Sequence, residues 1–253
     1  IEGVHFTPDA APRAVGHKAV GRVLSDIAAM GGEPLWMLVD IVAPRATSVA
    51  RIEGIYRGMR QLARASHTMI VGGDTSAGPA IELHLFAVGR VPAGCAVLRS
   101  GAHPGDVIYV TGALGGSRSG HHLAFAPRLR EGSWLRARKW ATAMMDLSDG
   151  LATDLPRLLV RSGVGAELET DRIPVAPAAR AMRDGRSALE HALGDGEDFE
   201  LLFTVRSARS AAFEAAWRRA WRDLACTRVG VSVGGAPRLR LRRASLKPSS
   251  CPT

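Results

Sequence analysis

Two aspartates three residues apart form the motif with the clearest chemical meaning in this sequence. Asp146 and Asp149 enclose Ser148 in the stretch AMMDLSDG, after an apolar run and before a helical pattern that begins at Leu151. Backbone N–H groups at the start of a helix favour phosphate oxygens, and nearby carboxylates can hold Mg²⁺ against the same phosphates. The motif therefore predicts a site for a phosphorylated ligand and a magnesium ion.

Acidic residues recur in three other segments, where the pattern also predicts the end of an element. They are Asp26 in LSDIAAMGG, Asp74 in IVGGDTSAG, and Asp195, Glu197 and Asp198 in LGDGEDFELLF. Oxygen ligands in this number suit Mg²⁺, and phosphoryl transfer needs little beyond positioning and charge stabilisation. Arg99 in LRSGAHPGD is the candidate cation for the phosphates. Neither a Walker A motif nor GxGxxG occurs, so a nucleotide would be bound by another scheme.

Each of these residues also has an ordinary structural interpretation. An aspartate after a strand is often a helix N-cap, and this applies to Asp149. His5 in EGVHF fits a surface or core histidine, and Glu197 with Asp198 fits a solvated turn. Ser148 lacks the G-x-S-x-G context of a nucleophilic serine, so no covalent intermediate is expected and no catalytic acid or base is assigned.

Helices and strands must bring these acids together, and the hydrophobic pattern predicts where they lie. Helices are expected at 13–30, 49–63, 115–125, 151–159, 187–193 and 208–224. Strands are expected at 35–43, 68–71, 81–87, 106–111, 143–145, 165–169, 199–205 and 228–233. Both halves are thus mixed α/β (α+β), and a Pro-, Gly- and Ser-containing stretch at 92–104 separates them. The predicted divisions are domains at 1–93 and 94–236 and a weakly ordered tail at 237–253.

Composition narrows the class of protein. The 253 residues are 46% hydrophobic, and no apolar run approaches the roughly 20 residues that span a bilayer. Three widely spaced cysteines without a CxxC pair indicate a cytoplasmic protein with reduced thiols. The formal charge of +9 raises the question of nucleic-acid binding, but aromatic residues are only 5% and do not alternate with arginines. An anionic small molecule explains the charge equally well, so neither a nucleic acid nor a membrane is expected as a partner.

Six motifs occur in the order and spacing of one enzyme family. They are EGVHFTPD, LSDIAAMGG, IVGGDTSAG, LRSGAHPGDVIYVTG, MMDLSDGLATDL and LGDGEDFELLFTV. Together they resemble thiamine-monophosphate kinase, whose superfamily also contains aminoimidazole ribonucleotide synthetase and selenophosphate synthetase. The resemblance covers roughly residues 1–235. GGDT is shared across the superfamily, whereas EGVHF with GEDFELLFTV points to the thiamine branch.

The resemblance implies Mg²⁺-assisted transfer of the ATP γ-phosphate to thiamine monophosphate, which gives thiamine diphosphate. The accepting oxygen is already anionic, so no general base is required. The implied Mg²⁺ ligands are Asp26, Asp74, Asp146 and Asp149. The implied ATP contacts are Gly73, Asp74, Arg99 and Ser148, and the implied contacts with thiamine phosphate are His5 and Glu197. The family also implies a homodimer in which the N-terminal domains pair their sheets into a barrel, and a C-terminal α/β sandwich.

This sequence departs from the family pattern in three places. Ala77 stands where the family's GGDTTRG has arginine, and Asp195 stands where GGED has glycine. The last residues lack the family's aromatic-bearing segment, and the metal-binding segment upstream of EGVHF is expected to lie in residues that precede Ile1. Two alternatives therefore stay open: a non-catalytic nucleotide-binding or dimerisation module of the same fold, and another ATP-using member of the superfamily.

Overall fold

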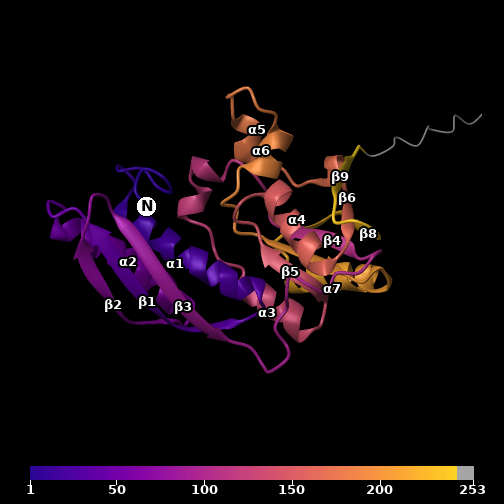
Figure 1. The fold of residues 1–253 in the computed structure, drawn as a ribbon, viewed down its shortest axis with the longest axis horizontal. Coiled ribbons are helices and arrows are strands. Elements are labelled where there is room, and N and C mark those ends of the chain that lie inside the picture. The colour runs from indigo at the N-terminus through magenta and orange to yellow at the C-terminus, as the bar shows by residue number, and fades with distance from the viewer. Residues whose placement is uncertain (244–253) are drawn as a thin grey trace, which may run out of the picture.

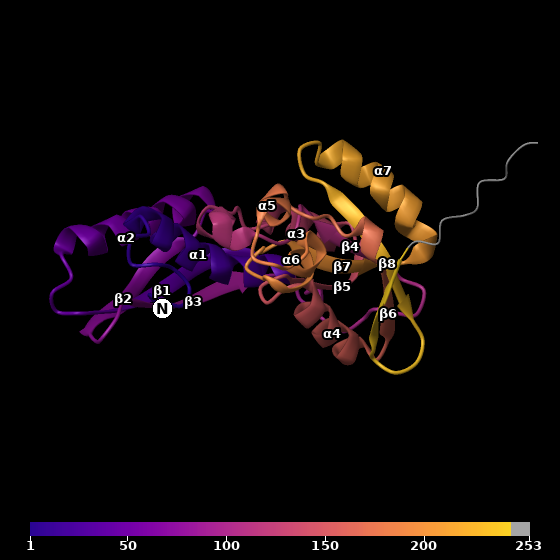
Figure 2. The same ribbon diagram turned by 90° about the horizontal axis from the view of Figure 1, so that it is seen from above.

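A computed structural model of the chain describes residues 1–243 and shows two mixed α/β domains that lie end to end (Figures 1 and 2). The N-terminal domain contains α1 (Pro12–Ala29), β1 (Glu33–Ala43), α2 (Val49–Ala65), β2 (Met69–Ala77) and β3 (Glu82–Arg90). The C-terminal domain begins with β4 (Val107–Thr111), η1 (Ser117–Ser119), η2 (His121–Leu123), α3 (Leu129–Ala137), β5 (Ala141–Asp146) and α4 (Leu151–Ser162). It continues with β6 (Gly165–Glu169), η3 (Thr170–Arg172), α5 (Pro177–Ala181), α6 (Ala188–Gly194), β7 (Leu201–Val205), η4 (Ser207–Arg209), α7 (Ser210–Ala220), β8 (Cys226–Val233) and β9 (Leu239–Arg242).

The N-terminal domain is a three-stranded sheet with two helices on one face. β1 lies in the centre, parallel to β2 and antiparallel to β3. Met37, Val39 and Ile41 alternate along β1 and are fully buried under the helices, as the period of a half-buried strand requires. Helices α1 and α2 pack closely at Gly16. A Cβ atom at this position would lie only 1.9 Å from the Ile55 carbonyl oxygen, so the contact requires glycine.

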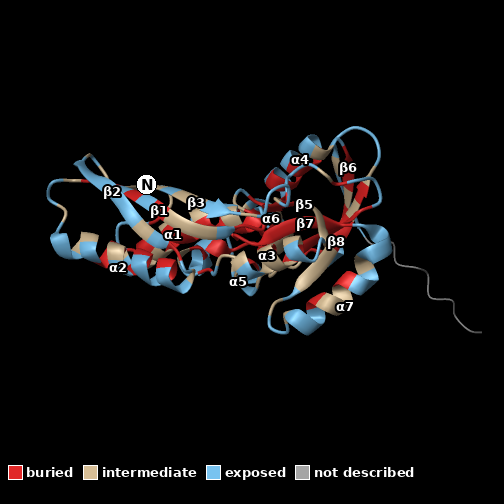
Figure 3. Ribbon diagram, turned by 90° about the horizontal axis from the view of Figure 1, so that it is seen from below, coloured by how far each residue is buried: buried red, intermediate tan, exposed pale blue. Residues whose placement is uncertain are grey.

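The opposite face of this sheet carries no helix and is exposed in Figure 3. Leu38 on β1, Met69 and Val71 on β2 and Phe86 on β3 are large apolar side chains with 37% to 64% of their surface exposed. Trp36 and Phe86 lie side by side here, with ring centroids 6.3 Å apart. An exposed apolar face of this kind marks a surface available for association.

The C-terminal domain is a six-stranded sheet in the order β5-β7-β4-β8-β6-β9 with helices on both faces. One core lies between the sheet and α4, where Leu151, Leu155 and Leu158 are fully buried. A second core lies on the other face, where the aromatic side chains of Phe213 and Trp217 on α7 pack against Tyr109 and Phe203. The C-terminal domain is therefore a layered α/β arrangement.

Several predicted elements have different bounds in the structure. β2 runs through the GGDT motif to Ala77 because residues 72–77 pair in parallel with β1. The helix expected at 115–125 is replaced by η1 and η2, where Gly116 and Gly120 have positive φ angles of 69° and 129°. α3 and α5 were not predicted at all. These differences arise where pairing partners or glycines override the local pattern.

The tail expected to be weakly ordered, 237–253, contains β9, so that expectation is wrong for Leu239–Arg242. β9 adds to the sheet edge in parallel with β6, and Arg242 Nη2 donates to Glu167 Oε1 at 2.7 Å. Residues 244–253 lie outside the described part of the chain. Across residues 1–243, no helix is both long and apolar enough to cross a membrane.

Helix α1 also joins the two domains. Leu123 and Leu129 of the C-terminal domain pack against the core beneath α1 and α2. Ala29, near the end of α1, packs in turn against the aromatic core of the C-terminal domain. Helix α1 therefore contacts the cores of both domains.

Candidate active site

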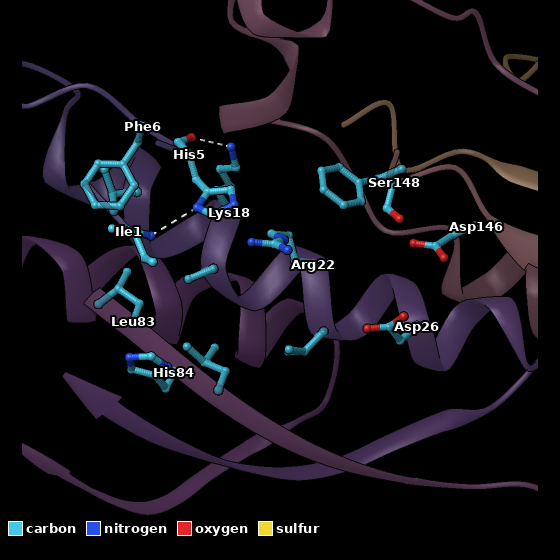
Figure 4. Close-up of a pocket in the computed structure, with 15 residues that line it drawn as sticks. Ile1, His5, Phe6, Lys18, Arg22, Asp26, Leu83, His84, Asp146 and Ser148 are labelled. Carbon is cyan, nitrogen blue, oxygen red and sulfur yellow. Dashed lines mark hydrogen bonds between the residues drawn. The ribbon is translucent and has the colours of Figure 1, made fainter. Parts of the chain in front are cut away.

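A cavity of about 430 Å³ lies between α1 and the segment that follows β5 (Figure 4). The N-terminal domain contributes polar side chains from α1, from the first residues and from β3, namely Lys18, Arg22, Asp26, His5 and His84. The C-terminal domain contributes Asp146, Ser148 and Phe199. The cavity thus unites residues more than 100 positions apart in the chain, from both domains.

Helix periodicity explains the wall that α1 supplies. Lys18, Arg22 and Asp26 are spaced four residues apart, so they lie one above another on one face of the helix. Val20 and Leu24, on another side of α1, are fully buried in the core of the N-terminal domain. The same packing that fixes the helix therefore holds the three charged side chains toward the cavity.

Asp146 is a buried carboxylate at the end of β5. Only 4% of its surface is exposed, and its Oδ2 accepts a hydrogen bond of 2.6 Å from Ser25 Oγ on α1. Burial, with a smaller contribution from the neighbouring Asp26 carboxylate, raises the pKa of Asp146 to about 6. Burial also raises the pKa of Asp26, against the opposing effects of Arg99 and Arg22. The two carboxylates thus face each other in a place where ionising both is costly.

The turn after Asp146 is held by a buried acid of α4. Asp154 is fully buried, and its Oδ2 accepts from the backbone nitrogens of Ser148 at 3.0 Å and Asp149 at 2.8 Å. Gly150 occupies the N-cap position of α4, so Asp149 is not the N-cap that the structural interpretation assumed. The Asp149 carboxylate instead pairs with Arg157 Nη1 at 2.5 Å.

The GDGEDF loop is tied to this turn from the opposite side. The backbone nitrogens of Glu197 and Phe199 donate to the carbonyl oxygens of Ser148 and Leu147, each at 2.8 Å. Glu197 and Phe199 have φ angles of 57° and 51°, a left-handed conformation that is unfavourable for side chains larger than glycine. The hydrogen bonds hold this conformation in place. Ser148 and Phe199, which are far apart in sequence, are therefore held together and both line the cavity.

An ion pair connects the GDGEDF loop to α1. Lys18 Nζ lies 2.7 Å from Glu197 Oε1, and the same Nζ donates to the carbonyl oxygen of His5 at 2.5 Å. Lys18 is 2% exposed, and burial lowers its pKa. Burial also lowers the pKa of His5. Lys18 therefore contacts both residues that the resemblance implies as contacts of thiamine phosphate, His5 and Glu197.

The fit of this cavity to a magnesium ion rests on Asp26 and Asp146. Within residues 1–243, no group of three or more histidine, cysteine, aspartate or glutamate side chains is arranged to hold a metal ion. Mg²⁺, however, is commonly bound through one or two carboxylates together with substrate phosphates and water. Burial raises the pKa of both carboxyls, and the charge of Asp26 adds to the cost of ionising Asp146, so a cation bound by the two would be favoured. The donor set therefore fits Mg²⁺ that is completed by a phosphorylated ligand.

The remaining predicted residues lie at different distances from this cavity. Arg99 lines a second cavity of about 560 Å³ with Arg161 and Met145, and Asp26 lines both cavities. Gly73 and Asp74 lie within β2, where the Asp74 nitrogen donates to Asp40 Oδ1 at 2.8 Å. Asp74 and Asp149 are not among the residues that line either of these two cavities. Their assignments to metal and ATP stay predictions.

The residues of the two cavities that received no role from the sequence include Lys18, Arg22, Phe199 and Arg161. The four-residue spacing of charges along α1 was a usable signal for Lys18 and Arg22, since it placed both on the face that carries Asp26. Phe199 gave no such signal, because an aromatic residue at the start of a strand is most often part of a core.

The fold and this cleft between two domains define a class of protein, and comparisons with known proteins agree with it. Residues 1–91 match the N-terminal domain family of AIR synthase related proteins, and residues 120–241 match the C-terminal domain family. The chain belongs, within this class, to the thiamine-monophosphate kinase family. A thiamine-monophosphate kinase of Rhodopirellula baltica is 39% identical over 241 residues, which cover 92% of this chain and 73% of that protein.

Solved structures give the same family. The crystal structure of thiamine-monophosphate kinase from Stenotrophomonas maltophilia K279a matches with a TM-score of 0.86 and 32% identity, over 94% of this chain and 81% of that one. A structure of AaThiL complexed with AMPPCP and TMP matches with a TM-score of 0.82 and 30% identity, over 96% of this chain and 82% of that one. The resemblance seen in the sequence motifs is therefore confirmed.

Proposed function

We propose that this chain transfers the γ-phosphate of ATP to thiamine monophosphate and forms thiamine diphosphate. The observation that carries this proposal is that Asp26 and Asp146, from two different domains, line one cavity with His5 and Lys18. Glu197 does not line the cavity but pairs with Lys18 at its wall. Such a cavity places a metal-binding end beside an end suited to a second ligand. A structure of its relative AaThiL is complexed with AMPPCP, an ATP analogue, and with TMP, which supports ATP and thiamine monophosphate as the two ligands.

The roles of the residues follow from their positions. Asp26 and Asp146 would hold Mg²⁺, which supplies charge neutralisation between the phosphates of ATP and the acceptor. Arg99 would bind ATP phosphates from the second cavity, and Ser148 would meet them at the start of α4. His5 and Glu197 would orient thiamine phosphate. The residues act by binding and alignment, which is sufficient for phosphoryl transfer to an anionic oxygen.

The quaternary structure and location belong to the same proposal. The uncovered face of the N-terminal sheet, with Leu38, Met69, Val71 and Phe86, suits pairing with a second copy into a barrel, as the family implies. A homodimer of this kind would bury the apolar side chains that are now exposed. A cytoplasmic location is supported by Cys95 and Cys226, which are free thiols.

Formation of thiamine diphosphate from thiamine monophosphate, ATP and Mg²⁺ is the direct test. Asp26→Asn should lower kcat at least about 100-fold, because it removes one of the two carboxylates that would hold the Mg²⁺ ion, and that ion neutralises the reacting phosphates. Asp223→Asn, a matched change at an exposed residue beyond α7, should leave the rate unchanged. Full activity of Asp26→Asn would contradict the metal assignment. Nucleotide binding without any turnover by the wild-type chain would favour the non-catalytic module.

A further inference from the structure

We propose that Arg22 binds the phosphate group of the acceptor and thereby makes the site selective for thiamine monophosphate over unphosphorylated thiamine. This inference rests on the proposed function and extends it to a residue outside the family motifs that assigned the other contacts. Two observations carry it: the position of Arg22 in the cavity, and the ion pairs and hydrogen bonds that the other basic side chains of the cavity already make.

Arg22 lies between the two ends of the cavity. It is one helical turn from Lys18 and one from Asp26, a rise of about 6 Å along the helix axis in each direction. In Figure 4 its guanidinium group extends into the space between Lys18 and Asp26, with Ser148 and Asp146 across the cavity. Its charge reaches both ends of the cavity, because it adds to the burial that lowers the pKa of His5 and partly opposes the burial that raises the pKa of Asp26. Arg22 therefore acts on both the substrate end and the metal end.

The other basic side chains that line the cavity are committed or neutral. Lys18 is buried in its ion pair with Glu197. His84 Nε2 lies 3.1 Å from Glu82 Oε2, and burial lowers the pKa of His5, so its ring is uncharged at neutral pH. Within residues 1–243, Arg22 makes no hydrogen bond or ion pair of its own. It is therefore the side chain in this cavity with a permanent, uncommitted positive charge.

The reaction requires such a charge at this place. Two phosphate groups must approach each other, and the carboxylates at the metal end add negative charge beside them. A guanidinium group can bind a phosphate through two parallel hydrogen bonds, which fixes both its position and its orientation. Thiamine lacks that phosphate, so it would gain nothing from Arg22. The residue thus distinguishes the two molecules by the group that must react.

The experiment compares Arg22→Ala and Arg22→Lys with the wild-type protein. Arg13→Ala serves as the matched control, because Arg13 is exposed on the same helix and pairs with Gln61 at 2.9 Å. Calorimetric titrations with thiamine monophosphate, thiamine and Mg²⁺-ATP measure three affinities, and steady-state rates give kcat and KM. Circular dichroism and thermal melting confirm that each variant is folded.

We expect Arg22→Ala to weaken thiamine monophosphate binding at least about 10-fold and to raise its KM similarly, as loss of a charge-assisted bidentate contact predicts. Thiamine and Mg²⁺-ATP affinities should change less than about 3-fold. The affinity of Arg22→Lys for thiamine monophosphate should lie between those of the wild type and Arg22→Ala, because lysine keeps the charge but cannot form two parallel hydrogen bonds.

Two results would overturn the inference while leaving the proposed function intact. One is wild-type affinity of Arg22→Ala for thiamine monophosphate, and the other is a loss confined to Mg²⁺-ATP, which would place Arg22 on the nucleotide. A wild-type protein that neither binds thiamine monophosphate nor forms thiamine diphosphate would overturn both.

Discussion

Replacement of Asp146 by asparagine should stabilise the metal-free protein while it removes activity. Burial raises the pKa of this carboxyl from 3.8 to about 6, so the ionised form is disfavoured in the folded state. At 1.36 kcal/mol per pH unit, the shift corresponds to about 3 kcal/mol. The folded protein holds a proton that the unfolded chain releases at lower pH. The stability that this proton contributes therefore falls as the pH rises from about 4 and is fully lost above about 6. Asparagine resembles the protonated acid and carries no such loss.

The assay is urea unfolding of both proteins in a metal chelator, at pH 5 and pH 8. About half of the gain should be present at pH 5 and nearly all of it at pH 8. A gain of 3 kcal/mol is an upper value, equivalent to roughly 6 to 12 °C in Tm for a chain of this size. The Ser25 hydroxyl can still donate to the amide oxygen, so its hydrogen bond is retained. The variant should form no thiamine diphosphate.

Magnesium supplies the internal control for this prediction. Mg²⁺ should raise the stability of the wild-type protein, because it offsets the charge of Asp146 and Asp26, and should have much less effect on Asp146→Asn. Equal stabilisation of both proteins by Mg²⁺, or a variant no more stable than the wild type at pH 8 in chelator, would refute the reasoning.

Two further predictions concern stability. Gly58→Ala should destabilise the protein by about 1 to 2 kcal/mol in urea unfolding, because its Cβ would lie 1.9 Å from the Arg13 carbonyl oxygen. The cost of this overpacking exceeds the roughly 1 kcal/mol that alanine gains in helix propensity. Equal or higher stability of the variant would show that α1 and α2 can separate freely. Arg128→Met should cost about 3 to 5 kcal/mol, since it leaves the Glu200 carboxylate, 2% exposed, without the cation 2.7 Å away. The double variant Arg128→Met/Glu200→Gln should regain much of that loss, and no regain would count against the charge explanation.

Much of the fold followed from local pattern. The apolar stripe of α1 predicted the helix at 13–30, observed at Pro12–Ala29, and the alternation at 81–87 predicted β3. The strand at 165–169 was predicted with its observed bounds. In each case one face packs against a core, so the period of the sequence carries the information. α3 was missed because its segment, LREGSWLRA, contains few apolar residues and buries only Gly132 and Leu135.

The candidate site was less predictable because long-range contacts build it. Asp26, Asp146, Ser148 and His5 were selected from the sequence, and they line one cavity. No local pattern predicts that Lys18 pairs with Glu197 across 179 positions. Nor does it predict that Glu197 and Phe199 adopt left-handed angles, held by hydrogen bonds that they donate to the carbonyl oxygens of Ser148 and Leu147. Nor does local pattern place Asp74, whose surroundings depend on the uncovered edge of the N-terminal sheet.

The Lys18–Glu197 pair has a thermodynamic consequence. It joins the same two domains that bring Asp26 to Asp146, so separating the domains would break the ion pair and dismantle the metal end together. Ligand binding and domain docking are then linked equilibria, and each must strengthen the other by the same free energy. A phosphorylated ligand and its cation would act as a bridge between the domains. Substitutions that weaken the docking of the domains would therefore lower the affinity for both the ligand and the cation, even where the substituted residue contacts neither.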